Sequence, residues 1–282
     1  MIRIAAMSDI HGIPQMVKLE EPVDVLCITG DWSPLRLQNA VTHKDGRRGS
    51  MRYWIRHEFL PWLKQQPAEH IIIIPGNHDF VTEQGWFRGW FQDLLREEHL
   101  LDTIHYLCNE SITLYGWRFW GCPYSDLPGW AWYSGGNVDV YTPKEETDIL
   151  LVHAAPRWEY VGTTITRYGR QENFGSTYLT NALIGMKVKP KLVLFGHIHG
   201  GDHRPTLFGN EFEGESLLVN VSTKDEMYCE CWDPALINCE MVENATLSQM
   251  DTVITVGKHK LGLQEEAACH VIHTPLLKTQ DE

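Results

Sequence analysis

Five short polar motifs contain aspartate, asparagine and histidine at spacings that suit metal coordination. They offer oxygen and nitrogen donors without thiolates, a set that suits manganese, iron, nickel or zinc. In chain order the motifs are Asp9-Ile10-His11-Gly12, Gly30-Asp31, Gly76-Asn77-His78-Asp79, His153-Ala154-Ala155-Pro156 and Gly196-His197-Ile198-His199. The candidate ligands are Asp9, His11, Asp31, Asn77, His153, His197 and His199. These seven exceed what one ion needs, and they form two sets of four if Asp31 bridges two ions.

Most of these motifs have an ordinary structural explanation when each is taken alone. Gly-Asp is a common turn at the end of a strand, and a lone histidine such as His153 more often forms hydrogen bonds within a loop. Gly-Asn-His-Asp is far rarer, at roughly one in 10⁵ positions from average composition. Because all five motifs occur in this order along one chain, chance does not explain them.

Each motif follows a short apolar segment that is predicted to be a strand. These segments are residues 2–7, 23–29, 71–74, 148–152 and 191–195. Residues 50–66, 84–98 and 179–187 have the apolar spacing of helices, with a kink expected at Pro61. Such alternation is typical of an α/β fold, in which loops at the carboxyl ends of strands line the ligand site. We therefore expect the five motifs to converge.

The ordered set of motifs resembles the calcineurin-like metallophosphoesterase superfamily over about residues 1–235. The resemblance implies a single α/β domain, built as a β-sandwich flanked by helices, with a dinuclear metal centre. For the first metal it implies the ligands Asp9, His11, Asp31 and His199. For the second it implies Asp31, Asn77, His153 and His197. It also implies that His78 is not a ligand but approaches the phosphate or leaving group, and that Asp79 orients His78.

The chemistry implied is hydrolysis of a phosphoester by two divalent metal ions, with manganese favoured and iron, zinc or nickel as alternatives. Two cations about 3.5–4 Å apart each bind a phosphoryl oxygen and share a hydroxide that attacks phosphorus. A histidine such as His78 that protonates the leaving group contributes typically about 10²–10⁴-fold.

Departures from the superfamily's pattern narrow the expected substrate. The second motif continues as Trp32-Ser33-Pro34 and the third ends in Asp79, which disfavours a protein phosphatase. Residues 153–156 and 219–223 look closer to small metallophosphodiesterases. We therefore expect hydrolysis of a small nucleotide phosphodiester, with cyclic nucleotides among the candidates. The alternatives are a phosphomonoesterase or a nuclease of the same superfamily, or a non-catalytic scaffold, which the seven filled ligand positions disfavour.

Residues 117–133 are dense in large aromatic side chains. Core packing is the commoner explanation, and we expect it for Trp117 and Trp120, which lie in a strand-like segment. Tryptophans on the following loop are candidates for stacking on a nucleobase. Two basic residues just past the last ligands are candidates for contacting phosphate. The candidate substrate contacts are Trp130, Trp132, His203 and Arg204.

The length, composition and net charge of the chain exclude several classes of protein. The 282 residues are 43% hydrophobic and 22% charged, as expected for one large globular domain, here residues 1–235 with a C-terminal extension of unknown role at 236–282. The net charge of −13 disfavours general nucleic-acid binding, and no apolar run approaches the ~18 residues of a membrane span. Seven scattered cysteines and the absence of a visible secretory signal predict reduced thiols and a cytoplasmic location. The oligomeric state stays open.

Overall fold

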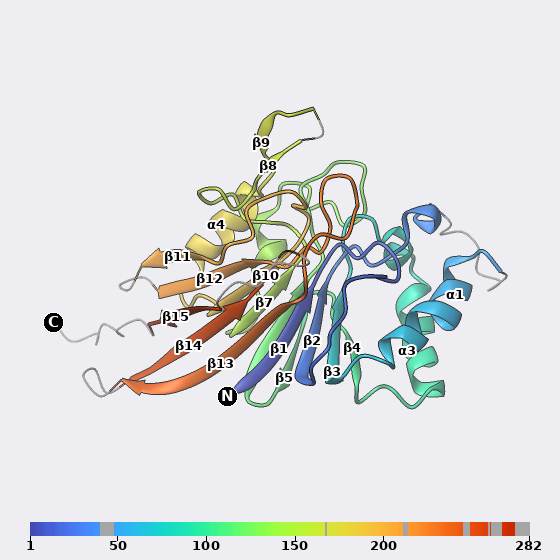
Figure 1. Ribbon diagram of the computed structural model, residues 1–282, viewed down its shortest axis with the longest axis horizontal. Coiled ribbons are helices and arrows are strands. Elements are labelled where there is room, and N and C mark those ends of the chain that lie inside the picture. Colours follow the sequence, from blue (N-terminus) through green and yellow to red (C-terminus); the bar gives the residue numbers. More distant parts are fainter. Residues whose placement is uncertain are drawn as a thin grey trace.

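Two β-sheets lie face to face at the centre of the protein (Figure 1). The computed structural model describes residues 1–39, 48–166, 168–210, 214–244, 249–258, 260 and 267–273. In spatial order the first sheet contains β15 (Ala268–Ile272), β14 (Gln249–Gly257), β13 (Ala235–Asn244), β1 (Ile2–Met7), β2 (Val23–Thr29), β3 (Ala68–Ile74) and β4 (Ile104–Tyr106). Strands β1 to β4 are parallel to one another, and β13 to β15 continue the sheet in antiparallel fashion.

The second sheet has a parallel centre and antiparallel edges. Its spatial order is β11 (Thr206–Asn210), β12 (Gly214–Asn220), β10 (Leu192–Phe195), β7 (Ile149–Val152), β6 (Trp117–Cys122) and β5 (Glu110–Leu114). Strands β5 and β6 form a hairpin whose turn is Tyr115-Gly116, and both residues have positive φ angles, as a type I′ turn requires. A separate hairpin pairs β8 (Thr163–Ile165) with β9 (Gln171–Asn173).

Helices cover the outer faces of both sheets, so the expected sandwich flanked by helices is confirmed. On the first sheet lie α1 (Met51–Trp54), a π-helical turn (Ile55–Phe59), α2 (Leu60–Leu63) and α3 (Phe87–Glu97). On the second lies α4 (Thr177–Gly185). Short 3-10 helices occupy Leu35–Leu37, Phe80–Glu83 and Val138–Tyr141. The π-helical turn lies just before Pro61, which has no amide hydrogen to donate within a regular helix.

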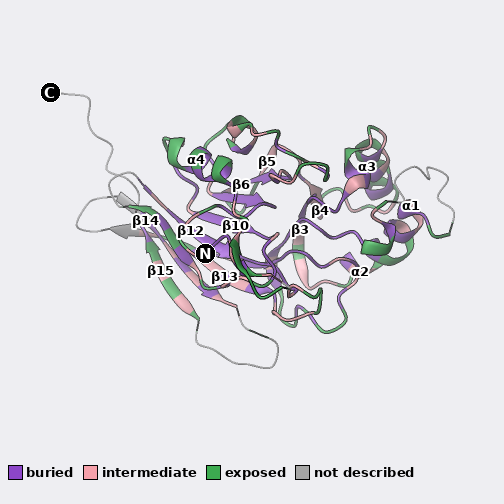
Figure 2. Cartoon of the chain, turned by 90° about the horizontal axis from the view of Figure 1, so that it is seen from above, coloured by how far each residue is buried: buried purple, intermediate pink, exposed green. Residues whose placement is uncertain are grey.

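Side chains along the central strands point alternately to the two faces of the sheet, so each strand packs on both the other sheet and the helices. In β1, Ile2, Ile4 and Ala6 face the second sheet, whereas Ala5 and Met7 face the helices. A strand buried on both faces is mostly apolar, as β1 is at every position except Arg3. Figure 2 shows these strands as buried and the outer sides of α1 to α4 as partly exposed. Trp117 and Trp120 are buried on opposite faces of β6, so the core packing expected for them is confirmed.

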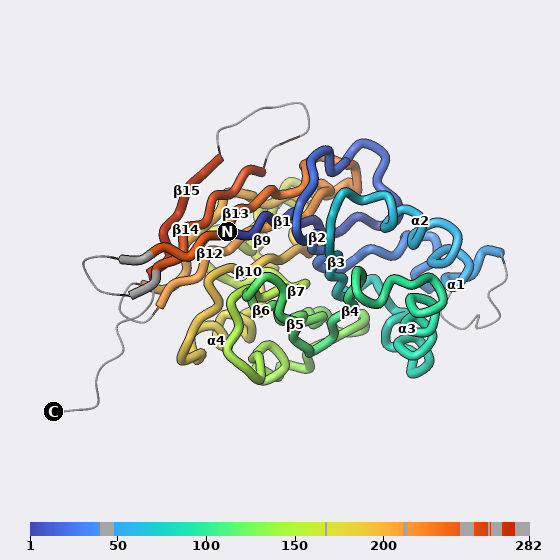
Figure 3. Tube along the Cα trace, turned by 90° about the horizontal axis from the view of Figure 1, so that it is seen from below, coloured from blue at the N-terminus to red at the C-terminus, as the bar shows by residue number. Residues whose placement is uncertain are grey.

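Residues beyond Pro234 carry only a faint pattern, yet their described part supplies three strands of the first sheet. Strand β13 pairs antiparallel with β1, from Ile2 opposite Cys239 to Ala6 opposite Ala235. Figure 3 shows these C-terminal strands in red beside the N-terminal strand in blue. Residues 236–282 are expected to form a C-terminal extension. Their described part, together with Ala235, forms β13 to β15, which widen the sheet that contains β1.

Candidate metal centre

The five polar motifs meet at one end of the sandwich, where β1, β2, β3, β7 and β10 end. Backbone hydrogen bonds tie the loops together: Asp9 N–H donates to Gly30 O at 3.1 Å, and His11 N–H donates to Asp31 O at 2.9 Å. The Gly196 N–H donates to His153 O at 3.1 Å, which joins the loops of β7 and β10. The convergence expected from the parallel strands is therefore what the structure shows.

Four candidate ligands have a left-handed backbone. The φ angles are +55° at Asp9, +45° at His11, +53° at Asp31 and +69° at His197. Few residues other than glycine adopt this region, and such strain gathers at functional sites. These turns bend the chain sharply where each strand ends, which brings the side chains into one cluster.

The glycines of the motifs leave room for the ligands. A Cβ atom on Gly30 would lie 2.4 Å from His153 Nδ1, and Gly30 also has a φ of +100°. A Cβ atom on Gly76 would lie 2.4 Å from Asp31 Oδ1. Both distances are too short for any side chain, so glycine is needed beside Asp31 and His153.

Asp9, His11 and His199 form one group with the spacing of metal ligands. The Nε2 atom of His199 lies 3.3 Å from Asp9 Oδ1, while its Nδ1 atom donates to the backbone oxygen of Asp225 at 3.2 Å. Bonding of one ring nitrogen to a carbonyl leaves the other free for a metal. The side chain of His11 is 2% exposed, and neither of its ring nitrogens has a hydrogen-bond partner.

Asp9, Asp31 and His153 form a second group that shares Asp9 with the first. The His153 Nε2 atom lies 3.4 Å from Asp31 Oδ2 and 2.8 Å from Asn77 Oδ1, and its Nδ1 atom donates to Thr29 O at 3.0 Å. The His197 ring packs edge-on against His153 with centroids 5.2 Å apart. The seven candidate ligands are therefore gathered around Asp9 and Asp31.

The charges in this cluster are strongly coupled. Burial raises the pKa of both Asp9 and Asp31, but neighbouring histidines, chiefly His199 and His153, outweigh it and hold both values well below the usual range. Burial lowers the pKa of His11 to about 3 and that of His197 to about 4. Although burial opposes it, the Asp31 carboxylate raises the pKa of His153 to about 9. Near neutral pH the Asp9 and Asp31 carboxylates are therefore ionised and the His11 and His197 imidazoles are neutral, which are the forms that bind a cation.

These residues fit a site for divalent metal ions. A buried polar atom without a partner is unfavourable by about 1–3 kcal/mol, and both His11 ring nitrogens are in that state. Carboxylate, amide and imidazole donors without thiolates are the set that accepts manganese, iron, nickel or zinc. A metal ion between these donors would remove the unfavourable burial at His11.

His78 lies beside the cluster, but its partner differs from the one expected. Its Nε2 atom is 3.9 Å from Asp31 Oδ2, and its Nδ1 atom lies 2.7 Å from the Gln38 side-chain oxygen. Asp79 instead accepts backbone N–H bonds from Asp31, Ser33 and Gly76, each at 2.8 Å. Both Asp79 oxygens are used to hold the loops, so Gln38, not Asp79, is placed to orient His78.

The two loop tryptophans differ in their surroundings. Trp130 is 36% exposed, and its ring lies 4.5 Å from the His78 ring, beside the cluster. Trp132 donates from its indole nitrogen to Thr82 Oγ1 at 2.7 Å and packs edge-on against Tyr124. The structure therefore brings Trp130 to the mouth of the site and gives Trp132 a role in fixing the loop.

The two basic candidates lie behind or outside the cluster. His203 is buried, stacks on Trp232 with centroids 4.1 Å apart, and has Nε2 3.0 Å from the backbone oxygen of His199. Arg204 pairs with both Asp202 carboxylate oxygens, and the shortest distance is 2.6 Å. His203 therefore supports the segment that carries His199, and Arg204 has a carboxylate partner of its own.

Tyr228 lies beside the histidines of the cluster, a position that the sequence analysis did not predict. Its ring centroid is 5.0 Å from that of His11 and 5.1 Å from that of His199. Its φ angle is +62°, and the residue is 41% exposed. A tyrosine between acidic residues belongs to no motif, so only the folded loop reveals its position.

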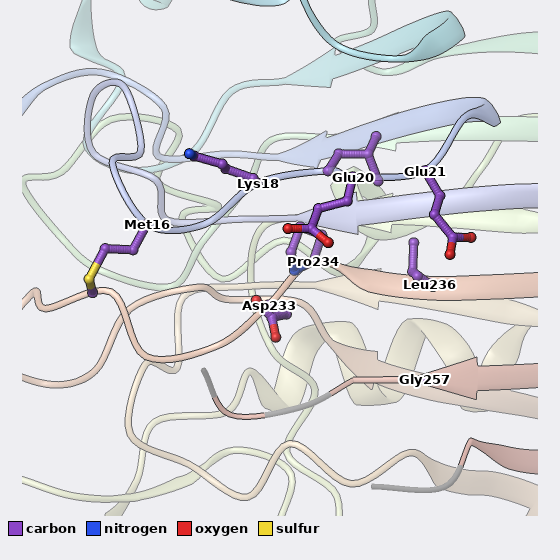
Figure 4. Close-up of a pocket in the computed structure, with 9 residues that line it drawn as sticks. Met16, Lys18, Glu20, Glu21, Asp233, Pro234, Leu236 and Gly257 are labelled. Atoms are coloured by element: carbon purple, nitrogen blue, oxygen red, sulfur yellow. The ribbon is translucent and has the colours of Figure 1, made fainter. Parts of the chain in front are cut away.

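A separate cavity of about 250 Å³ lies away from these residues (Figure 4). None of the candidate ligands lines it; the lining residues are Met16, Lys18, Leu19, Glu20, Glu21, Asp233, Pro234, Leu236 and Gly257.

Across the described ranges, every helix is too short or too polar to cross a bilayer.

Comparison with known proteins bears directly on this arrangement. The protein is 24% identical over 272 residues to human metallophosphoesterase domain-containing protein 1, covering 86% of this chain and 72% of the human protein. It is 22% identical over 264 residues to a UPF0046 protein of Caenorhabditis elegans, covering 87% and 83% of the two chains. A family profile described as calcineurin-like phosphoesterase matches residues 2–201, the stretch that contains every motif of the cluster. The chain therefore belongs to the calcineurin-like phosphoesterase family.

Proposed function

We propose that this protein is a phosphodiesterase that hydrolyses a small nucleoside phosphodiester with the help of two divalent metal ions. Family membership and the clusters of metal-ligating side chains support a metal-dependent phosphoric ester hydrolase. The observation that carries the proposal is the buried His11 ring, whose two nitrogens lack partners beside the ionised Asp9 and Asp31. When bound, such ions polarise the phosphoryl group and lower the pKa of water.

The residues of the chain would hold the ions in two sets that share Asp31. Asp9, His11, Asp31 and His199 would form the first set. Asp31, Asn77, His153 and His197 would form the second. Backbone oxygens of Thr29 and Asp225 accept hydrogen bonds from the Nδ1 atoms of His153 and His199, which leaves their Nε2 atoms to hold the ions.

His78 would act on the substrate rather than on the ions. Its Nδ1 atom is engaged by Gln38, which leaves Nε2 as the nitrogen that faces the centre. With Nδ1–H bonded to Gln38, His78 must carry a second proton on Nε2, and this imidazolium would pass the Nε2 proton to the leaving oxygen as the bond to phosphorus breaks. Asp79 would keep the Asp31 and Gly76 backbone in place through its two oxygens.

The choice of a nucleoside diester rests on Trp130. Its half-exposed ring touches His78 at the point where the organic group of a substrate would leave, and aromatic faces stack on nucleobases. Manganese is the favoured ion and the cytoplasm the expected compartment. His203 and Arg204 are less suited to bind substrate, since the first is buried and the second is paired with Asp202.

The test is a hydrolysis assay on the full chain after loading with manganese, iron, zinc or nickel. We expect bis-p-nitrophenyl phosphate to be cleaved faster than p-nitrophenyl phosphate, and a panel of cyclic nucleotides and dinucleotides to contain the best substrate. A His11→Gln variant serves as the matched control, because it removes a buried ligand of the cluster and should abolish the activity. A preference for monoesters would contradict the diester proposal, and no hydrolysis with any ion would contradict the enzyme.

A further inference from the structure

We propose that Tyr228 contacts the substrate at the mouth of the metal centre and donates a hydrogen bond from its hydroxyl to a phosphoryl oxygen. This inference rests on the proposed function. It adds a residue that lies outside the five motifs and beyond residues 2–201, the range that the family profile matches.

The position of the ring is the first argument. The Tyr228 ring lies edge-on to three histidines at once, with centroid distances of 5.0 Å to His11, 5.1 Å to His199 and 6.4 Å to His78. Tyr228 is 41% exposed, whereas the side chains of these histidines are 2–11% exposed, so Tyr228 lies on the solvent side of the three rings. A phosphoester bound beside these histidines would lie within reach of Tyr228.

The second argument is that the loop holds Tyr228 rigidly in an unfavourable conformation. Non-glycine residues with a φ near +62° are strained, and this residue is also large and 41% exposed. The Asp225 side chain accepts N–H bonds from Met227 and Cys229, each at 2.9 Å, on either side of Tyr228. Packing alone would bury the ring, so its exposure over the histidines points to a ligand.

The loop is also anchored to both halves of the site. Glu226 accepts bonds from Gly200 N–H at 3.1 Å and from Thr164 Oγ1 at 2.7 Å. The Glu230 carboxylate accepts the backbone N–H groups of Gln15 and Val17, in the loop after β1, at 2.8 and 2.9 Å. In Figure 1 this segment between β12 and β13 rises beside the loops that follow β1 and β2. Tyr228 is therefore fixed before a substrate arrives.

The chemistry of the side chain defines its role. Among the described residues no hydrogen-bond partner of the Tyr228 hydroxyl is found, although the hydroxyl is both a donor and an acceptor. A phosphoryl oxygen is a charged acceptor, and a bond from a neutral donor to a charged group is stronger than one between neutral groups. The hydroxyl would thus favour a phosphoester over a neutral ester.

The experiment compares Tyr228→Phe with Met227→Ala in the metal-loaded chain. Met227 is the neighbour on the same loop and is 70% exposed, so its variant controls for changes in the loop. We expect Tyr228→Phe to lower kcat/KM for bis-p-nitrophenyl phosphate by roughly 10–100-fold and to weaken binding of inorganic phosphate, measured by calorimetry, by a similar factor. Met227→Ala should change neither quantity, and elemental analysis should find the same metal content in both variants.

Two results would overturn the inference. Unchanged phosphate binding and turnover in Tyr228→Phe would show that the hydroxyl meets no phosphoryl oxygen. Loss of metal in Tyr228→Phe would show that the ring supports the ligands instead. Failure of the proposed function gives a different result, because a wild-type chain without hydrolytic activity would still bind phosphate through Tyr228 if the inference holds.

Discussion

Asp31 at the floor of the metal centre is 1% exposed, whereas Trp130 and Tyr228 on its rim are 36% and 41% exposed. The floor consists of residues from the five motifs, which are joined by backbone hydrogen bonds and packed so closely that a Cβ atom on Gly30, Gly76 or Gly196 would clash with a neighbour. The rim consists of aromatic residues on loops, with no common motif. On the roles proposed above, the floor carries out phosphate transfer, whereas the rim contacts the substrate, through Trp130 at its organic group and through Tyr228 at a phosphoryl oxygen.

The largest effect is expected at Asp31, the residue shared by both sets of ligands. Asp31→Asn keeps the shape of the side chain but removes its charge, so at least one metal ion should be lost. The rate should fall by at least about 10³-fold, because bound metal contributes several kcal/mol to catalysis. Elemental analysis measures the metal content, and hydrolysis of bis-p-nitrophenyl phosphate measures the rate. An active Asp31→Ala protein with two ions per chain would disprove the assignment.

His78 lies between floor and rim, and its loss should affect rate without affecting metal content. His78→Ala is expected to slow hydrolysis by roughly 10²–10⁴-fold, because no imidazole remains to protonate the leaving oxygen. The loss should shrink for substrates with more acidic leaving groups. Since His78 also groups with His11 and Asp31, a lower metal content in this variant would make it a ligand instead.

On the rim, Trp130 and Trp132 form a natural pair for comparison. Trp130→Ala should raise KM for a nucleotide substrate by about 5- to 150-fold and leave bis-p-nitrophenyl phosphate unaffected, because stacking contributes roughly 1–3 kcal/mol per base. Trp132→Ala should instead lower the melting temperature, since its indole bonds Thr82. Equal losses on both substrates for Trp130→Ala would make that ring structural.

Gln38 is expected to act only through His78. Gln38→Leu removes the acceptor of Nδ1 at similar volume and should reduce kcat about tenfold, whereas Gln38→Glu keeps an acceptor and should retain most of the activity. In a His78→Ala background, Gln38→Leu should have no added effect. Additive losses in the double variant would show that Gln38 works independently of His78.

The smallest effect is a pH dependence of the floor. His153 has a pKa raised to about 9, so in the metal-free chain it contributes stability below pH 6.5 that is lost as pH rises toward 9. His11, with a pKa lowered to about 3, contributes stability above pH 6.5 that is lost as pH falls toward 3. Together these two histidines therefore contribute most to the stability of the metal-free chain near pH 6.5, and thermal melts of the chain and of its His153→Ala variant across pH measure that contribution.

The same charge on His153 predicts proton release when metal binds. A metal ion on Nε2 must displace the proton, so about one proton per chain should leave at pH 7.5. Calorimetry of manganese binding in buffers of different ionisation enthalpy measures this number. A value of zero would mean that His153 is neutral before the metal arrives.

The floor could be predicted from sequence because its residues follow strands directly. Asp9, Asp31, Asn77, His153 and His199 are each set by local backbone, and parallel strands bring their loops together. Tyr228 and Gln38 could not be predicted in this way. Their positions depend on contacts such as Asp225 with His199 and Gln38 with His78, which join segments far apart in the chain.

The strands of the fold likewise differ in how well the sequence predicts them. Strands β7 and β10 are wholly apolar, and β1, β2 and β3 each contain an apolar run, so the sequence predicted all five within a few residues. In β13, Ala235, Ile237 and Cys239 face the core, but Asn238 and Glu240 interrupt the apolar run, so the signal is weak. Short strands such as β4 and β8 contain too few residues for any periodicity to be recognised.

The place of β1 between β2 and β13 has a consequence for synthesis of the chain on the ribosome. One edge of β1 stays without a partner until about 230 further residues have been made, because β13 begins only at Ala235. At roughly 5–20 residues per second, that interval lasts on the order of ten to fifty seconds. During that interval the nascent chain presents an apolar, unpaired strand edge, the kind of surface that chaperones cover and that promotes aggregation.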